Sequence, residues 1–219
     1  MSDLATKTKK GLQWSAIERI LTQGIQLLIT LLLARLLGPS AFGLVGMLAV
    51  FIAVANVFID SGFTSALIRK IDRNESDLVT AFYYNIIMSG LCYITLYISA
   101  PYIAEFYQHV ELENLLRVLG ITVLINAFTL IPRVNLNVVM DFKSQAKISV
   151  VSVLISGSVA IVLAINGVGV WALATQTLLN AFCTALLFNI FVPWRPRGKL
   201  SKKSIKYLFG YGKIGRAHV

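Results

Sequence analysis

Long runs of apolar residues alternate with short polar breaks along almost the whole chain. Each run is about as long as the roughly 20 residues that an α-helix needs to cross a hydrocarbon core of about 30 Å. The breaks carry turn residues, such as Gly38-Pro39 and the NGVG stretch at 166–169, because Pro cannot continue a helix and Gly readily ends one. The pattern predicts about six membrane-spanning helices, over residues 12–37, 41–66, 79–104, 113–138, 147–166 and 169–192.

Composition favours a protein embedded in a bilayer. Of the 219 residues, 57% are hydrophobic and only 14% are charged, and the mean hydropathy is +0.74. Soluble domains have about a quarter of their residues charged, so this chain has too little polar sequence to cover a soluble surface. We therefore expect an all-α, polytopic transmembrane helix bundle. The first run is too long for the apolar core of a signal peptide, and we interpret it as a retained span.

The net charge of +10 is concentrated on one side of this predicted topology. In a soluble protein such a charge would suggest nucleic acid, but here it follows the positive-inside pattern, so no nucleic acid partner is expected. On the opposite side of the membrane, the breaks hold only two Lys or Arg residues, Arg35 and Arg117, and both lie at the borders of the apolar runs. The nearby acids Glu105, Glu111 and Glu113 are expected in a loop on that side. Both termini are therefore predicted to be cytoplasmic. The basic side holds Lys7, Lys9, Lys10, Arg69, Lys70, Arg73, Lys143, Lys147, Arg195, Arg197, Lys199, Lys202, Lys203 and Lys206.

Four segments follow from these patterns. Residues 1–11 form a basic cytoplasmic N-terminus, and residues 12–192 form the six-helix lobe. Residues 193–213 form a basic, amphipathic segment that we expect on the inner leaflet. The last six residues, IGRAHV at 214–219, match one reading frame of a common sequencing adapter, and we interpret them as a non-native tail.

The sequence offers little that supports covalent chemistry. Cys92 and Cys183 both lie inside apolar runs, where cysteine behaves as a small hydrophobic residue. The two histidines, His109 and His218, have no metal-ligand spacing around them, and no nucleotide-binding loop or hydrolase motif is present. We expect no cofactor, no metal and no enzymatic activity.

Polar side chains recur at helical spacing inside several apolar runs. Residues at i, i+3, i+4 and i+7 share a helix face, and amide or charged groups cost too much free energy to face lipid. For the first and fourth runs the stripe predicts a wet cavity, whereas the serines of the fifth run indicate helix packing. The stripes are Ser15, Arg19, Gln23, Gln26 and Thr30; Asn56 and Asp60; Asn85, Ser89 and Cys92; Thr122, Asn126, Thr129, Arg133 and Asn137; Ser149, Ser152 and Ser156; and Gln176, Asn180 and Thr184.

Charged residues inside the runs fall into two layers. Glu18, Arg19, Asp60 and Arg133 share the inner third, where they could pair across helices, Glu18 with Arg133 and Arg19 with Asp60. Such a layer is either a static ion-pair network or a cytoplasmic gate. Arg35 and the second outer arginine, Arg117, either snorkel to headgroups or face the cavity and attract an anion such as a phosphate.

The run GLQWSAIERILTQGIQLLITLLLARLLGPSAFGLVGM resembles the start of Wzx-type polysaccharide exporters, which belong to the multidrug/oligosaccharidyl-lipid/polysaccharide superfamily. The similarity continues through FIDSGFTSALIRK, FYYNI, APYIAEFY, DFKSQAKISV and GVGVWALATQTLLNA. The branch that exports colanic acid and lipopolysaccharide is the most similar. The resemblance implies a two-lobe transporter of about twice this length, of which this chain would be the N-terminal lobe.

The resemblance further implies a flippase that moves undecaprenyl-diphosphate-linked oligosaccharide across the bacterial cytoplasmic membrane by alternating access. Its expected partners are that substrate, membrane lipids, and the polymerase and glycosyltransferases of polysaccharide synthesis. Two alternatives stay open: a cation-coupled multidrug antiporter of the same fold, and a non-transporting scaffold for polysaccharide enzymes. Glu18 and Asp60 are the predicted gate or ion-coupling residues. The predicted substrate contacts are Arg19, Arg35, Arg117, Arg133, Gln23, Gln26 and Asn126.

Overall fold

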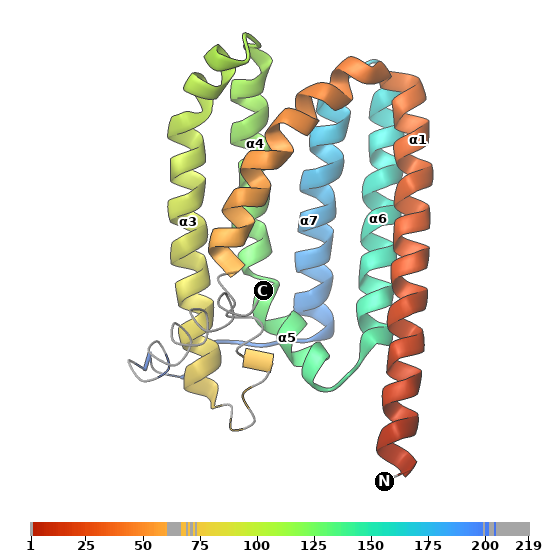
Figure 1. Ribbon diagram of the computed structural model, residues 1–219, viewed down its shortest axis with the longest axis vertical. Coiled ribbons are helices and arrows are strands. Elements are labelled where there is room, and N and C mark those ends of the chain that lie inside the picture. Colours follow the sequence, from red (N-terminus) through yellow and green to blue (C-terminus); the bar gives the residue numbers. More distant parts are fainter. Residues whose placement is uncertain are drawn as a thin grey trace, which may run out of the picture.

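The computed structural model is a bundle of long helices that lie roughly parallel to one axis, as Figure 1 shows. It describes residues 2–60, 67–68, 70, 72, 74–198, 200–201 and 204; for residues 2–19 and for Asp60 it describes the backbone alone. No strand occurs within these described ranges. The predicted all-α membrane helix bundle is therefore confirmed. We call the end of the bundle that holds the chain's N-terminus in Figure 1 the lower end, and the opposite end the upper end.

Helix α1 (Ser2–Asp60) contains the first two predicted spans. At Gly38 the backbone leaves the helical region, with φ 74° and ψ 175°, and Pro39 follows. Only glycine reaches that left-handed φ without steric cost, and the proline ring then blocks the continuing helix. Figure 1 shows the result: the first limb of α1 rises beside α6, and the second descends obliquely across the bundle toward the lower end. The apolar stretch Ile20–Ile59, 40 residues long, thus extends through both limbs of α1.

The other predicted spans are also helical, with shifted borders. Helix α3 begins four residues earlier than predicted and α6 five residues earlier, because each start is stabilised by a side chain. In α6, Asp141 accepts a hydrogen bond from the backbone N–H of Ser144 at 3.1 Å, as expected of an N-cap. The remaining helices are α3 (Glu75–Phe106), α4 (Glu111–Ala127), α5 (Leu130–Val138), α6 (Phe142–Ile165) and α7 (Trp171–Phe191).

The fourth predicted span is not one straight helix. Helices α4 and α5 meet at Phe128-Thr129 with a bend of 44°. Pro132 explains the bend, because its ring lacks the N–H that would bond to Phe128 four residues earlier and clashes with that carbonyl. The prediction of a continuous helix over 113–138 is therefore wrong in this respect. The bend leaves α5 at an angle across the lower end of the bundle (Figure 1).

Small residues let the helices of the bundle approach closely. Ser152 and Ser156 on α6 are buried, which confirms the prediction that this stripe serves packing. Beside them, Gly157 leaves room for Ile29 of α1: a Cβ added to Gly157 would overlap Ile29 Cδ1 and lie 3.0 Å from Ile29 Cγ1. Small residues at such contacts are typical of membrane helices, where close packing replaces the hydrophobic driving force. The first limb of α1 is thereby fixed against α6.

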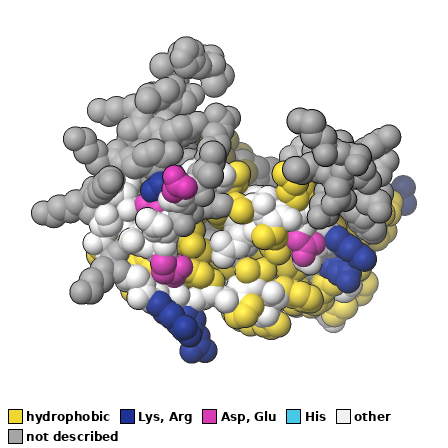
Figure 2. All heavy atoms as spheres, turned by 90° about the horizontal axis from the view of Figure 1, so that it is seen from below, with side chains coloured by type: hydrophobic (Ala, Val, Ile, Leu, Met, Phe, Trp, Pro, Cys, Tyr) yellow, Lys and Arg dark blue, Asp and Glu magenta, His cyan; other side chains and the backbone are white. Residues whose placement is uncertain are grey.

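The two ends of the bundle differ in charge. At the lower end, Lys70 Nζ lies 2.6 Å from Asp77 Oδ2 at the start of α3, and Trp194 Nε1 donates a hydrogen bond to Glu75 Oε1 at 3.1 Å. This second contact ties the chain after α7 to the start of α3. Figure 2, a view of this end, shows Lys and Arg side chains beside acidic ones at its margins and uncharged atoms between them. The acids predicted in an outer loop lie instead in helices, namely Glu105 in α3 and Glu111 and Glu113 in α4.

Candidate functional site

A polar cavity of about 370 Å³ lies between the second limb of α1, α3 and the bent pair α4–α5. The bundle around it is apolar. Polar side chains cost free energy inside a membrane and usually have a functional role there, so a group of them around one cavity indicates a functional site. Five of its lining residues carry amide, hydroxyl or guanidinium groups. The full lining is Asn56, Ile59, Asn85, Val123, Asn126, Ala127, Thr129, Leu130 and Arg133.

The cavity forms where the helix breaks. The α4–α5 bend lies between Asn126, at the end of α4, and Arg133, in the first turn of α5. Thr129, at the bend, donates a hydrogen bond from Oγ1 to the backbone carbonyl of Asn126 at 2.7 Å. The same carbonyl also accepts the backbone N–H of Thr129 at 3.0 Å, so it keeps hydrogen-bond partners although the helix is interrupted. Discontinuous helices at membrane depth are tolerated where they are buried in protein or line a water-filled cavity, and they often mark binding sites in transporters.

The side chains around the cavity are placed by defined contacts. Asn85 on α3 is buried, at 3% exposure, and its Oδ1 accepts a hydrogen bond from Ser89 Oγ at 3.3 Å. The guanidinium carbon of Arg133 lies 5.6 Å from the ring centroid of Phe188 on α7, within the range of a cation–π interaction. Arg133 is nevertheless an exposed side chain. The cavity therefore presents one guanidinium group together with three amides and a hydroxyl.

The structure brings two of the predicted substrate contacts together, Asn126 and Arg133. It adds three lining residues that sequence reasoning did not name as site residues: Asn56, Asn85 and Thr129. All three belong to the polar stripes of their helices, so the signal was present. What the sequence lacked was the information that the stripes of the second, third and fourth runs meet at one place.

Other predicted contacts lie elsewhere. Arg117, in α4 near the upper end, has its guanidinium 2.7 Å from Glu113 Oε1 and 4.5 Å from the ring centroid of Tyr97. Its charge is thus balanced by an acid one turn earlier in the same helix, a favourable i, i+4 pair. Arg35 is exposed, three residues before the turn at Gly38. Their role as anion contacts stays a prediction.

Gln23 and Gln26 lie on the first limb of α1, which packs against α6 through Ile29 rather than lining the cavity. Gln23 is exposed and Gln26 half-buried. The side chains of Glu18, Arg19 and Asp60 lie outside the part of the chain whose side chains the structure describes. The predicted gate therefore stays a prediction. The described backbone does place position 60 one helical turn after Asn56 and directly after Ile59, both of which line the cavity.

The helices and the cavity together define a multi-pass, all-α membrane protein. Four described helices are long and apolar enough to cross a membrane, and the bent pair α4–α5, taken as one span, is a fifth candidate. The chain belongs to the family described as polysaccharide biosynthesis protein, whose family model matches residues 32–215. This agrees with the resemblance to Wzx-type exporters.

Three curated relatives are similar over most of this chain. Teichuronic acid biosynthesis protein TuaB of Bacillus subtilis is 29% identical over 97% of the chain, and succinoglycan biosynthesis transport protein ExoT of Rhizobium meliloti is 23% identical over 96%. Lipopolysaccharide biosynthesis protein WzxC of Escherichia coli is 25% identical over 86%. The chain covers 44%, 43% and 38% of their respective lengths, so it spans less than half of each. No solved structure matches the chain.

Proposed function

We propose that this chain supplies one lobe of a flippase that moves a diphosphate-linked oligosaccharide, carried on a polyprenyl lipid, across the bacterial cytoplasmic membrane. The polar cavity at the α4–α5 bend is the observation that carries the proposal. Family membership supports the wider role in polysaccharide biosynthesis, and the named transport function of one relative supports translocation rather than synthesis. The chain would then act without covalent chemistry, by exchanging inward-open and outward-open states.

The chemistry of the cavity favours an anionic, hydroxyl-rich ligand. Arg133 is a guanidinium suited to bidentate contact with phosphate oxygens, and Asn56, Asn85 and Asn126 offer donors and acceptors for sugar hydroxyls. None of the described lining residues is a carboxylate. A cationic drug would meet a like charge there, which makes the antiporter alternative less favourable than the flippase.

The basic lower end supports an orientation with that end in the cytoplasm. Lys70 and the lysines at the start of α6, Lys143 and Lys147, belong to the basic breaks of the chain. The positive-inside rule places such breaks on the cytoplasmic side. The cavity, which α5 lines near that end, would then lie toward the leaflet in which a lipid-linked precursor is made.

Binding to the purified chain in lipid nanodiscs tests the proposal. The probe is undecaprenyl diphosphate, and the variants are Arg133→Gln and, as a matched control, Arg195→Gln, because Arg195 is an exposed arginine after α7 that does not line the cavity. We expect Arg133→Gln to weaken binding about tenfold or more, because a hydrogen bond to a charged group contributes about 1.5–3 kcal/mol. The control should bind as the parent chain does.

Three results would contradict the proposal. Equal weakening by both variants would mean that the effect is a general response to lost charge. Binding of the cation tetraphenylphosphonium in preference to the diphosphate would move the antiporter alternative forward. A scaffold would bind neither probe, and its partner binding would depend on residues 193–213 rather than on Arg133.

A further inference from the structure

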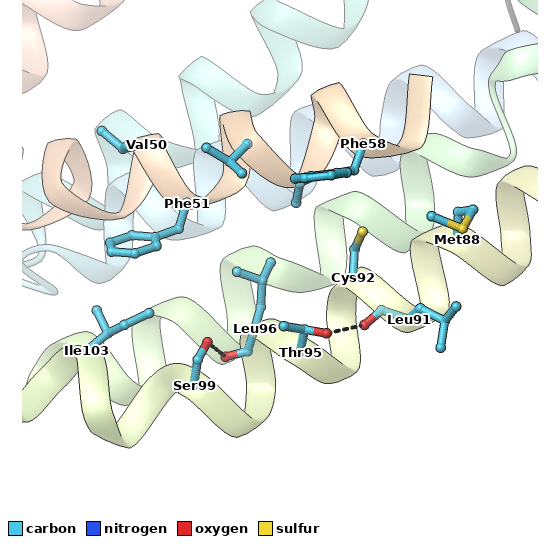
Figure 3. A pocket seen from close by; sticks show the side chains of 12 residues that line it. Val50, Phe51, Phe58, Met88, Leu91, Cys92, Thr95, Leu96, Ser99 and Ile103 are labelled. Atoms are coloured by element: carbon cyan, nitrogen blue, oxygen red, sulfur yellow. Dashed lines mark hydrogen bonds between the residues drawn. The ribbon is translucent and has the colours of Figure 1, made fainter. Parts of the chain in front are cut away.

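A second cavity, of about 720 Å³, lies between the second limb of α1 and helix α3. Figure 3 shows side chains of the two helices facing one another across it, among them Phe51 and Phe58 from α1 and Cys92 and Ile103 from α3. Its volume is within the range of about 300–1,000 Å³ that is usual for ligand pockets. Its lining is Val50, Phe51, Val54, Ala55, Phe58, Met88, Leu91, Cys92, Thr95, Leu96, Ser99 and Ile103.

The lining of this groove is chemically apolar. It has two hydroxyl groups, and both are already bonded to their own helix. Thr95 Oγ1 donates to the Leu91 carbonyl at 2.9 Å, and Ser99 Oγ donates to the Leu96 carbonyl at 3.1 Å, as the dashed lines in Figure 3 mark. No donor is thus left pointing into the groove from these two residues. The groove is suited to hydrocarbon and not to a sugar or a phosphate.

The groove is open to the side. Val50 and Phe58 on α1 are 62% and 60% exposed, and Leu91 on α3 is 55% exposed. A long, flexible chain could therefore enter it laterally from the bilayer, without passing through the core of the bundle.

The groove and the polar cavity lie next to each other along the same two helices. On α1, Ala55 and Phe58 line the groove while Asn56 and Ile59 line the polar cavity. On α3, Asn85 lines the polar cavity, and the groove begins three residues later at Met88. From Met88 to Ile103 the groove follows α3 for about 22 Å, at about 1.5 Å per residue, which is most of the thickness of a hydrocarbon core of about 30 Å.

We propose that the groove between α1 and α3 holds the polyprenyl tail of the lipid-linked substrate while its diphosphate head occupies the polar cavity beside Arg133. This inference rests on the proposed function and assigns the lipid part of the substrate to a place of its own. The order of the two cavities matches the order of an amphiphile: polar groups at the α4–α5 bend, then hydrocarbon along α3 toward the upper end. The tail stays in contact with the bilayer through the open side of the groove.

Site-directed photocrosslinking tests this assignment. The photoreactive residue p-benzoylphenylalanine is incorporated at position 95, which lines the groove, or at position 94 as a matched control. Ile94 is the adjacent residue, is exposed like Thr95, and does not line the groove. The full chain in nanodiscs is irradiated with radiolabelled undecaprenyl diphosphate or, separately, with radiolabelled phosphatidylglycerol at the same mole fraction.

We expect the polyprenyl diphosphate to label position 95 more strongly than position 94, and phosphatidylglycerol to label both alike. The excess at position 95 should fall when Arg133→Gln is added. Equal labelling of the two positions by the diphosphate would overturn the inference, since the groove would then be a contact for bulk lipid only. Crosslinking of position 95 to a second copy of the chain would also overturn it, because the groove would then be an interface.

The binding assay separates the failure of this inference from that of the proposed function. If binding of the diphosphate depends on Arg133 but position 95 shows no excess labelling, only the assignment of the tail to the groove is wrong. If binding does not depend on Arg133, both that assignment and the proposed function are wrong. A variant that fills the groove gives an independent test. Cys92→Trp should weaken binding of the diphosphate about tenfold or more, because a misfit of even one methylene group in an apolar pocket lowers affinity by about that factor. Ile94→Trp is its control, and equal binding by the two variants would count against the groove.

Discussion

The contact between Gly157 of α6 and Ile29 of α1 allows a quantitative test of the packing. A methyl group added to Gly157 would overlap Ile29 Cδ1 and lie 3.0 and 3.2 Å from Ile29 Cγ1 and Cγ2. Overpacking of this kind usually costs about 1–3 kcal/mol. We therefore expect Gly157→Ala to lower the free energy of unfolding by about 1–3 kcal/mol, although alanine is the better helix former.

The source of that cost can be identified with a second substitution. Ile29→Val removes Cδ1, the atom that the new methyl group would overlap, and by itself should cost about 0.5–1.5 kcal/mol. Because it also relieves the overlap, the double variant should be more stable than the sum of the two single effects predicts, by about 1 kcal/mol, within the range of about 0.5–3 kcal/mol for residues in contact.

The assay is reversible unfolding of the purified chain in detergent micelles by titration with sodium dodecyl sulfate, followed by circular dichroism. Gly24→Ala is the matched control, because Gly24 is also inside a membrane helix and a Cβ there would meet nothing within 4 Å. That control should be neutral or stabilising by about 0.5–1 kcal/mol. The reasoning is refuted if Gly157→Ala resembles Gly24→Ala, or if the effects at positions 157 and 29 simply add.

Three further predictions concern single side chains. Asp141 caps α6, so Asp141→Ala should cost about 0.5–2 kcal/mol at neutral pH. The hydrogen bond from Ser144, with the nearby positive charges of Lys143 and Lys147, holds the pKa of Asp141 below its ordinary value of 3.8. The stability that the ionised Asp141 contributes is therefore present above pH 3.8 and is lost as the pH falls through the folded-state pKa. If the unfolding free energies of parent and variant changed with pH in parallel, this expectation would be wrong. Ser152 Oγ is buried without a hydrogen-bond partner among the described residues, so Ser152→Ala should be neutral or stabilising in the same unfolding titration. Pro132→Ala should straighten the α4–α5 bend and weaken diphosphate binding in nanodiscs while the unfolding free energy stays equal or rises; unchanged binding would show that the bend does not shape the cavity.

The membrane-spanning helices could be predicted from the sequence because hydropathy over a whole run is a strong signal. Their borders and internal breaks could not, because they depend on single residues. Asp141 starts α6 earlier than the hydropathy indicates, since an N-cap side chain satisfies backbone groups in a polar segment. Pro132 bends the fourth span although the apolar run continues through it. Hydropathy averaged over a window of residues does not register that a single residue lacks its backbone N–H.

The candidate site was predictable in its parts but not as a whole. Helical spacing identified the stripes that contain Asn56, Asn85 and Asn126. Spacing within one helix cannot say which neighbouring helix a stripe faces, because that depends on tertiary packing. The ion pair of Arg117 with Glu113 was, by contrast, readable from the sequence, since the two residues are four apart. The expected loop around Glu113 concealed that pair.

The position of the α4–α5 bend links the two proposed parts of the binding site. The bend interrupts a helix at the one level where the polar stripes of α1, α3 and α4 meet, between Asn85 and Arg133. Directly above that level, the face of α3 that carries Asn85 becomes apolar, from Met88 onward, and Ala55 and Phe58 of α1 line the groove beside Asn56 and Ile59. A soluble anion would need only the polar half of this arrangement, and an ordinary membrane lipid only the apolar half. A ligand with a charged, hydroxyl-bearing head and a long hydrocarbon tail uses both, which is why we favour a lipid-linked sugar over either simpler ligand.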